Sequence, residues 1–335
     1  MINNKITYPE IASYILVALG LWVILTYGLL VALFAGLLVH SLVLILSPSL
    51  DVGIGKGRAR IVSVSLIGTF IITSLTLAIW GAITFFQSEA GSAHALLQKM
   101  ADIVEASRSQ CPEWICSHLP DNTEELREFI ANWMREHSQY AQSISTHAGH
   151  TTVRILLGMI IGAMISLHTI NHLPSAPLAA ALLDRLKTLS RAFKKVVFAQ
   201  IRISAVNTFF TGLYILVLLP LFDIHLPMAK SLVVITFVAG LLPIVGNLIS
   251  NTILVIVALP FGVPVALSSL VFLIVLHKFE YFLNAKIIGT QIQAKAWELL
   301  IAMLVMEAVF GIAGVVAAPI FYAYMKQELI NRHLI

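Results

Sequence analysis

The sequence predicts an all-α, polytopic membrane protein with about eight hydrophobic segments, a Pro/Gly-broken hairpin and a small extracytoplasmic helical insertion. Hydrophobic residues make up 59% of its 335 residues and charged residues only 11%, whereas soluble domains carry about 25% charged residues. Runs without Asp, Glu, Lys or Arg recur along the chain, and the longest includes the 46 consecutive positions 231–276. Because one membrane crossing needs about 20 apolar residues, these runs indicate several crossings.

Residues 1–87 are expected to form a transmembrane hairpin and a third span. The charge-free run 11–50 fits two crossings that turn near Tyr27-Gly28. It is far longer than the roughly 7–15 apolar residues of a cleavable signal peptide. A further apolar run at 61–87 provides the third crossing.

Residues 88–152 form the predicted extracytoplasmic domain of short amphipathic helices. This stretch holds nine acidic and four basic residues, whereas basic residues are concentrated in 47–60 and 173–198. Short loops rich in Lys and Arg stay in the cytoplasm, which places both basic loops inside and 88–152 outside. The chain's only cysteines, Cys111 and Cys116, lie in the outer region. A disulfide and two free thiols are both open there.

Residues 153–198 are predicted to hold a fourth span at 153–171 and a cytoplasmic amphipathic helix. The apolar stripe of that helix is flanked by five basic residues; the stripe consists of Leu182, Leu186, Leu189 and Phe193, and the basic residues are Arg185, Lys187, Arg191, Lys194 and Lys195. Such a helix can lie in the membrane interface on anionic lipid or pack against a neighbouring subunit. Within the fourth span, Gly158 and Gly162 have the spacing of a helix-packing pair.

Residues 199–335 are expected to form a transport core, which begins with a polar stripe on one apolar helix. The stripe residues follow one another at helical spacing: Gln200, Ser204, Asn207 and Thr211. They can hydrogen-bond a polar solute or simply join helices in lipid. Between 231 and 259, Pro243, Gly246, Asn247 and Asn251 would break the helix and free backbone polar groups, which survive at membrane depth only in protein or beside water. A re-entrant hairpin, one and a half crossings and a plain kink are all compatible with this pattern.

Two carboxylates fall within or beside apolar segments and are candidates for function by default. Glu280 shares a helical face with Asn284, and Glu307 interrupts the apolar segment 299–325. Glu307 could contact a cation, a proton or the substrate, or it could tie two helices together. Phosphate-loop, His-Glu-x-x-His and Gly-x-Ser-x-Gly signatures are missing from the sequence, as are recognisable metal-ligand spacings and nucleic-acid modules. We therefore expect no enzyme activity, cofactor, metal or nucleic-acid partner.

The C-terminal half resembles the autoinducer-2 exporter family of bacterial membrane permeases. The resemblance is carried by the following motifs in this order: Phe193-Lys-Lys-Val-Val-Phe-Ala-Gln200, Asn207, Leu242-Pro243-Ile-Val-Gly246, Glu280 with Asn284 and Gly289, and Glu307-x-x-Phe310-Gly311-x-x-Gly314-x-x-x-x-Pro319. It implies eight spans in the bacterial inner membrane, cytoplasmic termini and a homo-oligomer, a pentamer in the family. Asn284-Ala285 stands where family members often carry a proline, and Ala296-Trp297-Glu298 stands where they usually carry a histidine-proline pair. These departures bear on the substrate more than on the fold.

The leading hypothesis is a gradient-driven or passive permease that exports a small polar metabolite or signal such as autoinducer-2. Its solute or ion pathway would comprise Gln200, Ser204, Asn207, Pro243, Gly246, Asn247, Asn251, Glu280, Asn284 and Glu307. A sodium/proton-type antiporter that uses the membrane carboxylates is the second hypothesis. A non-transporting envelope scaffold built on 88–152 is the third. Small solute, membrane lipids and further copies of the chain are the expected partners.

Overall fold

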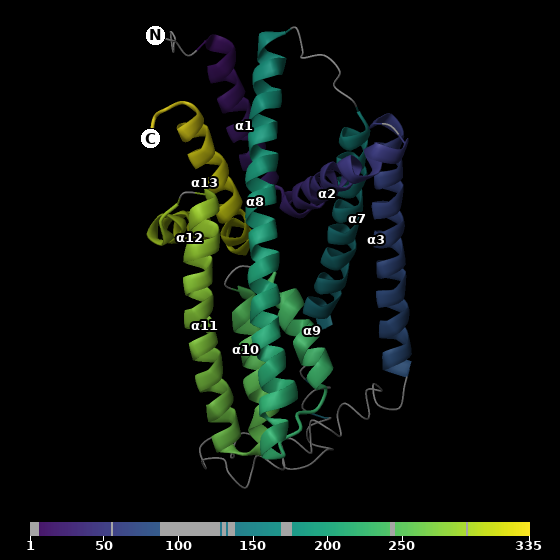
Figure 1. Cartoon of the computed structure of the whole chain (residues 1–335), viewed down its shortest axis with the longest axis vertical. Coiled ribbons are helices and arrows are strands. Elements are labelled where there is room, and N and C mark those ends of the chain that lie inside the picture. The colour runs from purple at the N-terminus through teal and green to yellow at the C-terminus, as the bar shows by residue number, and fades with distance from the viewer. Residues whose placement is uncertain are drawn as a thin grey trace. The chain divides into compact units, whose positions relative to one another are not determined.

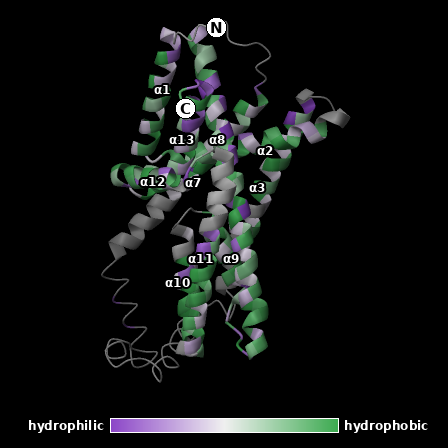
Figure 2. Cartoon of the chain, turned by 60° about the vertical axis from the view of Figure 1, so that its left-hand side comes forward, coloured by the Kyte–Doolittle hydropathy of each residue, from purple (hydrophilic) through white to green (hydrophobic). Residues whose placement is uncertain are grey.

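The computed structural model describes residues 7–54, 56–87, 128, 132, 138–168, 176–241, 245–292 and 294–335, and these are helical apart from short connections (Figure 1). Four of the described helical segments are long and apolar enough to span a membrane: Tyr8–Thr26, Leu30–Leu50, Gly149–Leu167 and Pro177–Phe222. In Figure 2 hydrophilic residues gather on α13 and the first half of α8, and hydrophobic residues dominate elsewhere. The all-α, polytopic prediction is confirmed.

The described helices divide into two compact units. The first unit contains Met1–Thr69, His150–Gln200 and Leu283–Ile335, and the second contains Phe70–Gly149 and Ile201–Phe282. The acidic segment 88–127 lies outside the described residues, and with it the cysteines Cys111 and Cys116.

The N-terminal hairpin has its turn where the sequence predicts it. Helix α1 covers Tyr8–Thr26 and α2 covers Leu30–Ile54. Between them Gly28 has a φ of +65°, a left-handed conformation that glycine adopts without steric penalty. Helix α3 covers Lys56–Gln87, so the basic segment 47–60, expected to be a loop, is helical on both sides of residue 55.

Helices α2 and α7 (Ser138–Leu167) pack in parallel through matched steps of four residues. Arg154 donates to the Gly28 carbonyl at one end, and His40 Nδ1 lies 2.8 Å from Ser166 Oγ at the other. Between these ends, a Cβ on Gly158 would lie 2.1 Å from the Ala32 carbonyl oxygen. A Cβ on Gly162 would lie 2.2 Å from the carbonyl oxygen of Gly36. Only glycine permits this close approach, and the predicted packing role of the pair is confirmed.

Helix α8 corrects the prediction of a separate amphipathic helix in 173–198. It is one 37-residue helix, Pro177–Leu213, which continues as a π-helical turn, η1 (Tyr214–Leu218), and a 3-10 turn, η2 (Pro220–Phe222). At 1.5 Å per residue it is about 56 Å long, nearly twice the hydrocarbon core. Residues 177–198 are therefore continuous in one helix with the apolar segment that follows them. Leu189 and Phe193 are buried in the first unit, and Leu186 is exposed.

The broken hydrophobic segment forms two short helices in the second unit. Helix α9 covers Ala229–Gly240 and α10 covers Val245–Ala258; 12 and 14 residues make them about 18 and 21 Å long. Neither length crosses a core of about 30 Å. They pack as a hairpin, since a Cβ on Gly246 would lie 1.7 Å from the Ala239 carbonyl oxygen, and Leu232, Leu254 and Ala258 share one core. This geometry favours the re-entrant alternative over a plain kink.

The C-terminal segment 299–325, expected to be one span, is a second hairpin. After η3 (Leu259–Phe261) and the 30-residue helix α11 (Val263–Ile292), α12 covers Ala296–Phe310 and α13 covers Ile312–Asn331. Gly311, with a φ of +62°, makes the turn between α12 and α13. A Cβ on Gly314 would lie 1.9 Å from the Met306 carbonyl oxygen, so the two helices are in backbone contact there. Reversal at Gly311 is the physical reason that a single span does not form.

Candidate functional site

The polar stripe of α8 joins this helix to the tip of the α9–α10 hairpin. Ser204 is buried, and its hydroxyl donates to the carbonyl of Phe237 at 2.7 Å. Next to that carbonyl the last turn of α9 tightens, because the Leu241 N–H bonds the Val238 carbonyl three residues back. The Ser204 hydroxyl thereby satisfies a carbonyl at the frayed end of the helix, where helical partners run out.

One turn further along α8, Asn207 meets the carboxylate of α11. Its Nδ2 donates to Glu280 Oε2 at 3.3 Å, and both side chains are 7% exposed. Two members of the predicted pathway, 73 residues apart in sequence, are therefore brought together in the interior of the second unit. An amide and a carboxylate in this position supply donors and acceptors for a polar solute, and the carboxylate can attract a cation.

Polar contacts continue along the same helix. Tyr214 places its hydroxyl 3.0 Å from Ser269 Oγ and stacks its ring on Phe272 at a centroid distance of 4.2 Å. Between Asn207 and Tyr214, the Thr211 hydroxyl is buried and has no hydrogen-bond partner within the part of the chain that the structure describes. A buried hydroxyl without a partner is unfavourable, so this position suits a bound water or solute. The side chains from 204 to 214 thus form one polar line between α8, α9 and α11.

The other predicted pathway residues either lie away from the Asn207–Glu280 contact or fall outside the described residues. Gln200 and Gly246 are buried and Asn251 is half-buried. Pro243 and the side chains of Asn247 and Asn284 lie outside the described residues.

Glu307 belongs to the first unit, in the last turn of α12. Its side chain is exposed and makes no hydrogen bond or ion pair within the described residues. The alternative that Glu307 ties two helices of one chain together therefore finds no contact to support it.

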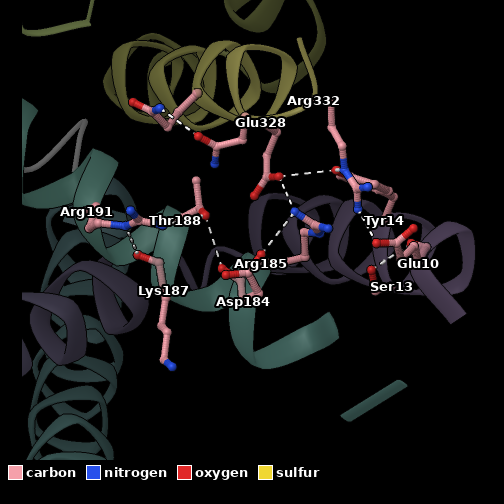
Figure 3. A network of polar contacts seen from close by, with 12 residues as sticks. Glu10, Ser13, Tyr14, Asp184, Arg185, Lys187, Thr188, Arg191, Glu328 and Arg332 are labelled. Carbon is pink, nitrogen blue, oxygen red and sulfur yellow. Dashed lines mark hydrogen bonds and ion pairs between the residues drawn. The ribbon is translucent and has the colours of Figure 1, made fainter. Parts of the chain in front are cut away.

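Sequence reasoning missed a buried ionic network in the first unit, where α1, α8 and α13 meet (Figure 3). Arg185 forms an ion pair with Glu328, and these residues are 3% and 5% exposed. The Arg185 guanidinium also stacks over the Tyr14 ring, 4.2 Å from its centroid. Arg332 extends the network by bonding Glu10 Oε1 at 2.6 Å and the Tyr14 hydroxyl at 3.3 Å.

Arg185 was expected to flank the apolar stripe, yet it is buried on it. The signal was present in the spacing, because Arg185 precedes Leu189 and Phe193 by four and eight residues and so shares their helical face. Three buried polar atoms around the pair have no partner among the described residues: Arg185 Nε, Glu328 Oε1 and the Tyr324 hydroxyl. These atoms belong to a buried polar cluster in the first unit that the Arg185–Glu328 ion pair holds together.

A smaller polar cluster joins the two arms of the C-terminal hairpin. Glu298 accepts hydrogen bonds of 2.5 Å from both the Lys326 ammonium and the Tyr322 hydroxyl. These bonds, that from Lys326 first, hold the pKa of the Glu298 carboxyl below its usual range. Among the described residues no group of three or more His, Cys, Asp or Glu side chains could hold a metal ion.

Comparison with known protein families gives a match over nearly the whole chain. Residues 11–331 match the family described as AI-2E family transporter. The chain is also 32% identical over 135 residues to the Bacillus subtilis (strain 168) protein named "Putative transport protein YdbI". That match covers 39% of this chain and 37% of the relative. No solved structure matches.

Proposed function

Because the chain belongs to the AI-2E transporter family, we propose that it is a gradient-driven or passive permease that exports a small polar solute of the autoinducer-2 class. The pathway passes the polar line of α8, where Asn207 and Glu280 meet beside the tip of the α9–α10 hairpin. The buried Asn207–Glu280 pair is the observation that carries the proposal. In lipid, ionisable groups are costly and are retained mainly where they contact solute, ion or water.

Transport by purified full-length protein in liposomes tests this role. Vesicles loaded with a radiolabelled small furanone-type solute release it through the wild-type chain. Asn207→Leu and Glu280→Gln reduce the rate tenfold or more, whereas Asn331→Leu, at an exposed amide, leaves it unchanged. An interhelical hydrogen bond in lipid averages about 0.6 kcal/mol, less than the about 1.4 kcal/mol of a tenfold effect. Wild-type rates in both site variants would reduce the pair to a packing contact.

The same carboxylate favours a second candidate function, sodium/proton antiport with Glu280 as the proton carrier. It is a carboxylate that is 7% exposed, within reach of an amide donor. In this alternative an imposed sodium gradient drives proton movement in vesicles without added solute, and Glu280→Gln abolishes it. Proton movement that stays at the level of protein-free vesicles rules out the antiporter and leaves the permease.

In the proposed orientation, both termini and the basic segments lie on the cytoplasmic side of the bacterial inner membrane, and residues 88–152 lie on its outer side. The parallel packing of α2 and α7 supports it, since that topology requires both helices to run inward. Oligomerisation, a pentamer in the family that the sequence resembles, is part of the same proposal. Accessibility of cysteines introduced at Tyr27 and Lys56 to a membrane-impermeant thiol reagent tests the orientation, with labelling at Tyr27 alone expected.

A further inference from the structure

One face of α8 carries a line of exposed cations. Arg191 follows Lys187 by four residues, the adjacent pair Lys194 and Lys195 follows Arg191 by three and four, and Arg202 follows Lys195 by seven, so all five lie on one side of the helix. Arg202 is the last of them, and it lies at the start of the second unit. Beyond Arg202 this face carries no charge up to Phe222.

The same face then becomes an apolar groove. Ala205 and Phe209 follow Arg202 by three and seven residues, and Phe209 is 65% exposed. With Leu216 and with Val233 and Phe237 of α9, they line an open groove of about 530 Å³. Gly212 lies among these residues without a side chain of its own, and a Cβ there would meet nothing closer than 3.7 Å, from Val233 Cγ2.

We propose that Arg202 and this groove bind one anionic phospholipid, with the phosphate at Arg202 and an acyl chain in the groove. Charge supports this occupant, because a headgroup phosphate is complementary to a guanidinium that ends a line of cations. Length supports it as well, since residues 205–217 rise about 18 Å along the helix, close to the about 15 Å of one leaflet of the hydrocarbon core. The α8 side of the groove lies within the candidate span Pro177–Phe222, and its other side belongs to the shorter apolar helix α9.

The opposite end of the groove fits an anion less well. Exposed Lys230 lies there in the first turn of α9, three residues before Val233, but the connection that precedes α9 carries the exposed carboxylate of Asp223. Lys230 therefore serves as a charge-matched control for Arg202. Gly212→Leu tests the groove itself, because leucine favours helix more than glycine does and its side chain would occupy the groove.

The experiment measures lipid retained by the full-length protein after extraction from vesicles of equal phosphatidylglycerol and phosphatidylcholine, by native mass spectrometry. Wild-type protein retains phosphatidylglycerol in preference to phosphatidylcholine. Arg202→Gln lowers that preference about fivefold, as expected for one cation at about 1 kcal/mol. Lys230→Gln leaves it unchanged, and Gly212→Leu reduces retention of both lipids at unchanged thermal stability.

Three results would overturn the site. If Arg202→Gln and wild type show equal preference for phosphatidylglycerol, Arg202 does not bind the headgroup. If Lys230→Gln loses the preference instead, the headgroup binds at the opposite end of the groove from the proposed site. If Gly212→Leu dissociates an oligomer in the same spectra and leaves lipid retention intact, a second copy of the chain occupies the groove.

Discussion

Replacing Gly162 by alanine should separate α2 from α7, and the structure gives the size of the effect. The new Cβ would lie 2.2 Å from the Gly36 carbonyl oxygen and 2.7 Å from Gly36 Cα. Ordinary contact begins near 3.4 Å, so the helices must move apart by about 1.2 Å, since packed backbones have little free space. Overpacking of this kind costs about 1–3 kcal/mol.

The same movement breaks the polar contact four residues along. His40 Nδ1 and Ser166 Oγ, now 2.8 Å apart, would separate to about 4 Å, beyond hydrogen-bond distance. An interhelical bond in lipid contributes about 0.6 kcal/mol. Together the two terms predict that Gly162→Ala lowers the free energy of unfolding by about 1.5–3.5 kcal/mol.

Reversible denaturant unfolding of the purified protein in mixed micelles measures this change. Gly20→Ala is the matched control, because nothing lies within 4 Å of a Cβ at that helical position and alanine is the better helix former. It should be neutral or stabilising. If Gly162→Ala unfolds at the same denaturant concentration as Gly20→Ala, the close approach of α2 and α7 is wrong.

Three further outcomes follow from the polar contacts and the hairpin tip. Arg185→Met should cost about 3–5 kcal/mol because it leaves the buried Glu328 carboxylate without its cation, with the Tyr14 hydroxyl still donating to it at 3.2 Å, and adding Glu328→Leu should restore most of that stability in the same unfolding assay. Gly246→Ala, with its Cβ 1.7 Å from a carbonyl oxygen, should reduce liposome transport, whereas Gly212→Ala should not. Because the pKa of Glu298 is lowered in the folded state, its ionised carboxylate stabilises the fold above the usual carboxyl range. The difference in melting temperature between wild type and Glu298→Gln should shrink as pH falls below that range and vanish only once pH has fallen through the lowered pKa; a constant difference would contradict this assignment.

Composition and charge-free runs were sufficient to predict the helical membrane class. Glycine residues predicted a chain turn and a close contact between two helices. The turn at Gly28 and the packing of Gly158 and Gly162 were both predicted, because no other residue tolerates a left-handed turn or backbone contact so readily. The spacing of Asn207 on α8 predicted its polar face. Its partner could not be identified in this way, because Glu280 lies 73 residues away on another helix and only tertiary packing brings the two together.

The remaining errors have physical causes of the same kind. Residues 177–213 read as an amphipathic helix followed by a span, since hydrophobicity changes along them, but nothing in the sequence interrupts the helical backbone between the two. Arg185 was assigned to the surface by residue type, whereas its position on the apolar face decided its burial. Segment 299–325 was expected to be one span because it is apolar almost throughout, but Gly311 reverses the chain within it.

The α9–α10 and α12–α13 hairpins bear on how a solute would pass through the protein. A broken helix in a bilayer points to a water-filled path because freed backbone groups need partners. At the end of α9, however, the Ser204 hydroxyl supplies a protein partner for the Phe237 carbonyl, so that group does not require water. The C-terminal hairpin reverses at Gly311 with the Gly311 N–H still bonded to the Glu307 carbonyl at 2.7 Å. The Phe237 carbonyl and the Gly311 N–H thus both have partners within the protein. In the permease proposed above, solute would instead pass the α9–α10 hairpin at the Asn207 amide and the Glu280 carboxylate, which are in contact inside the protein, with the buried Thr211 hydroxyl one turn away.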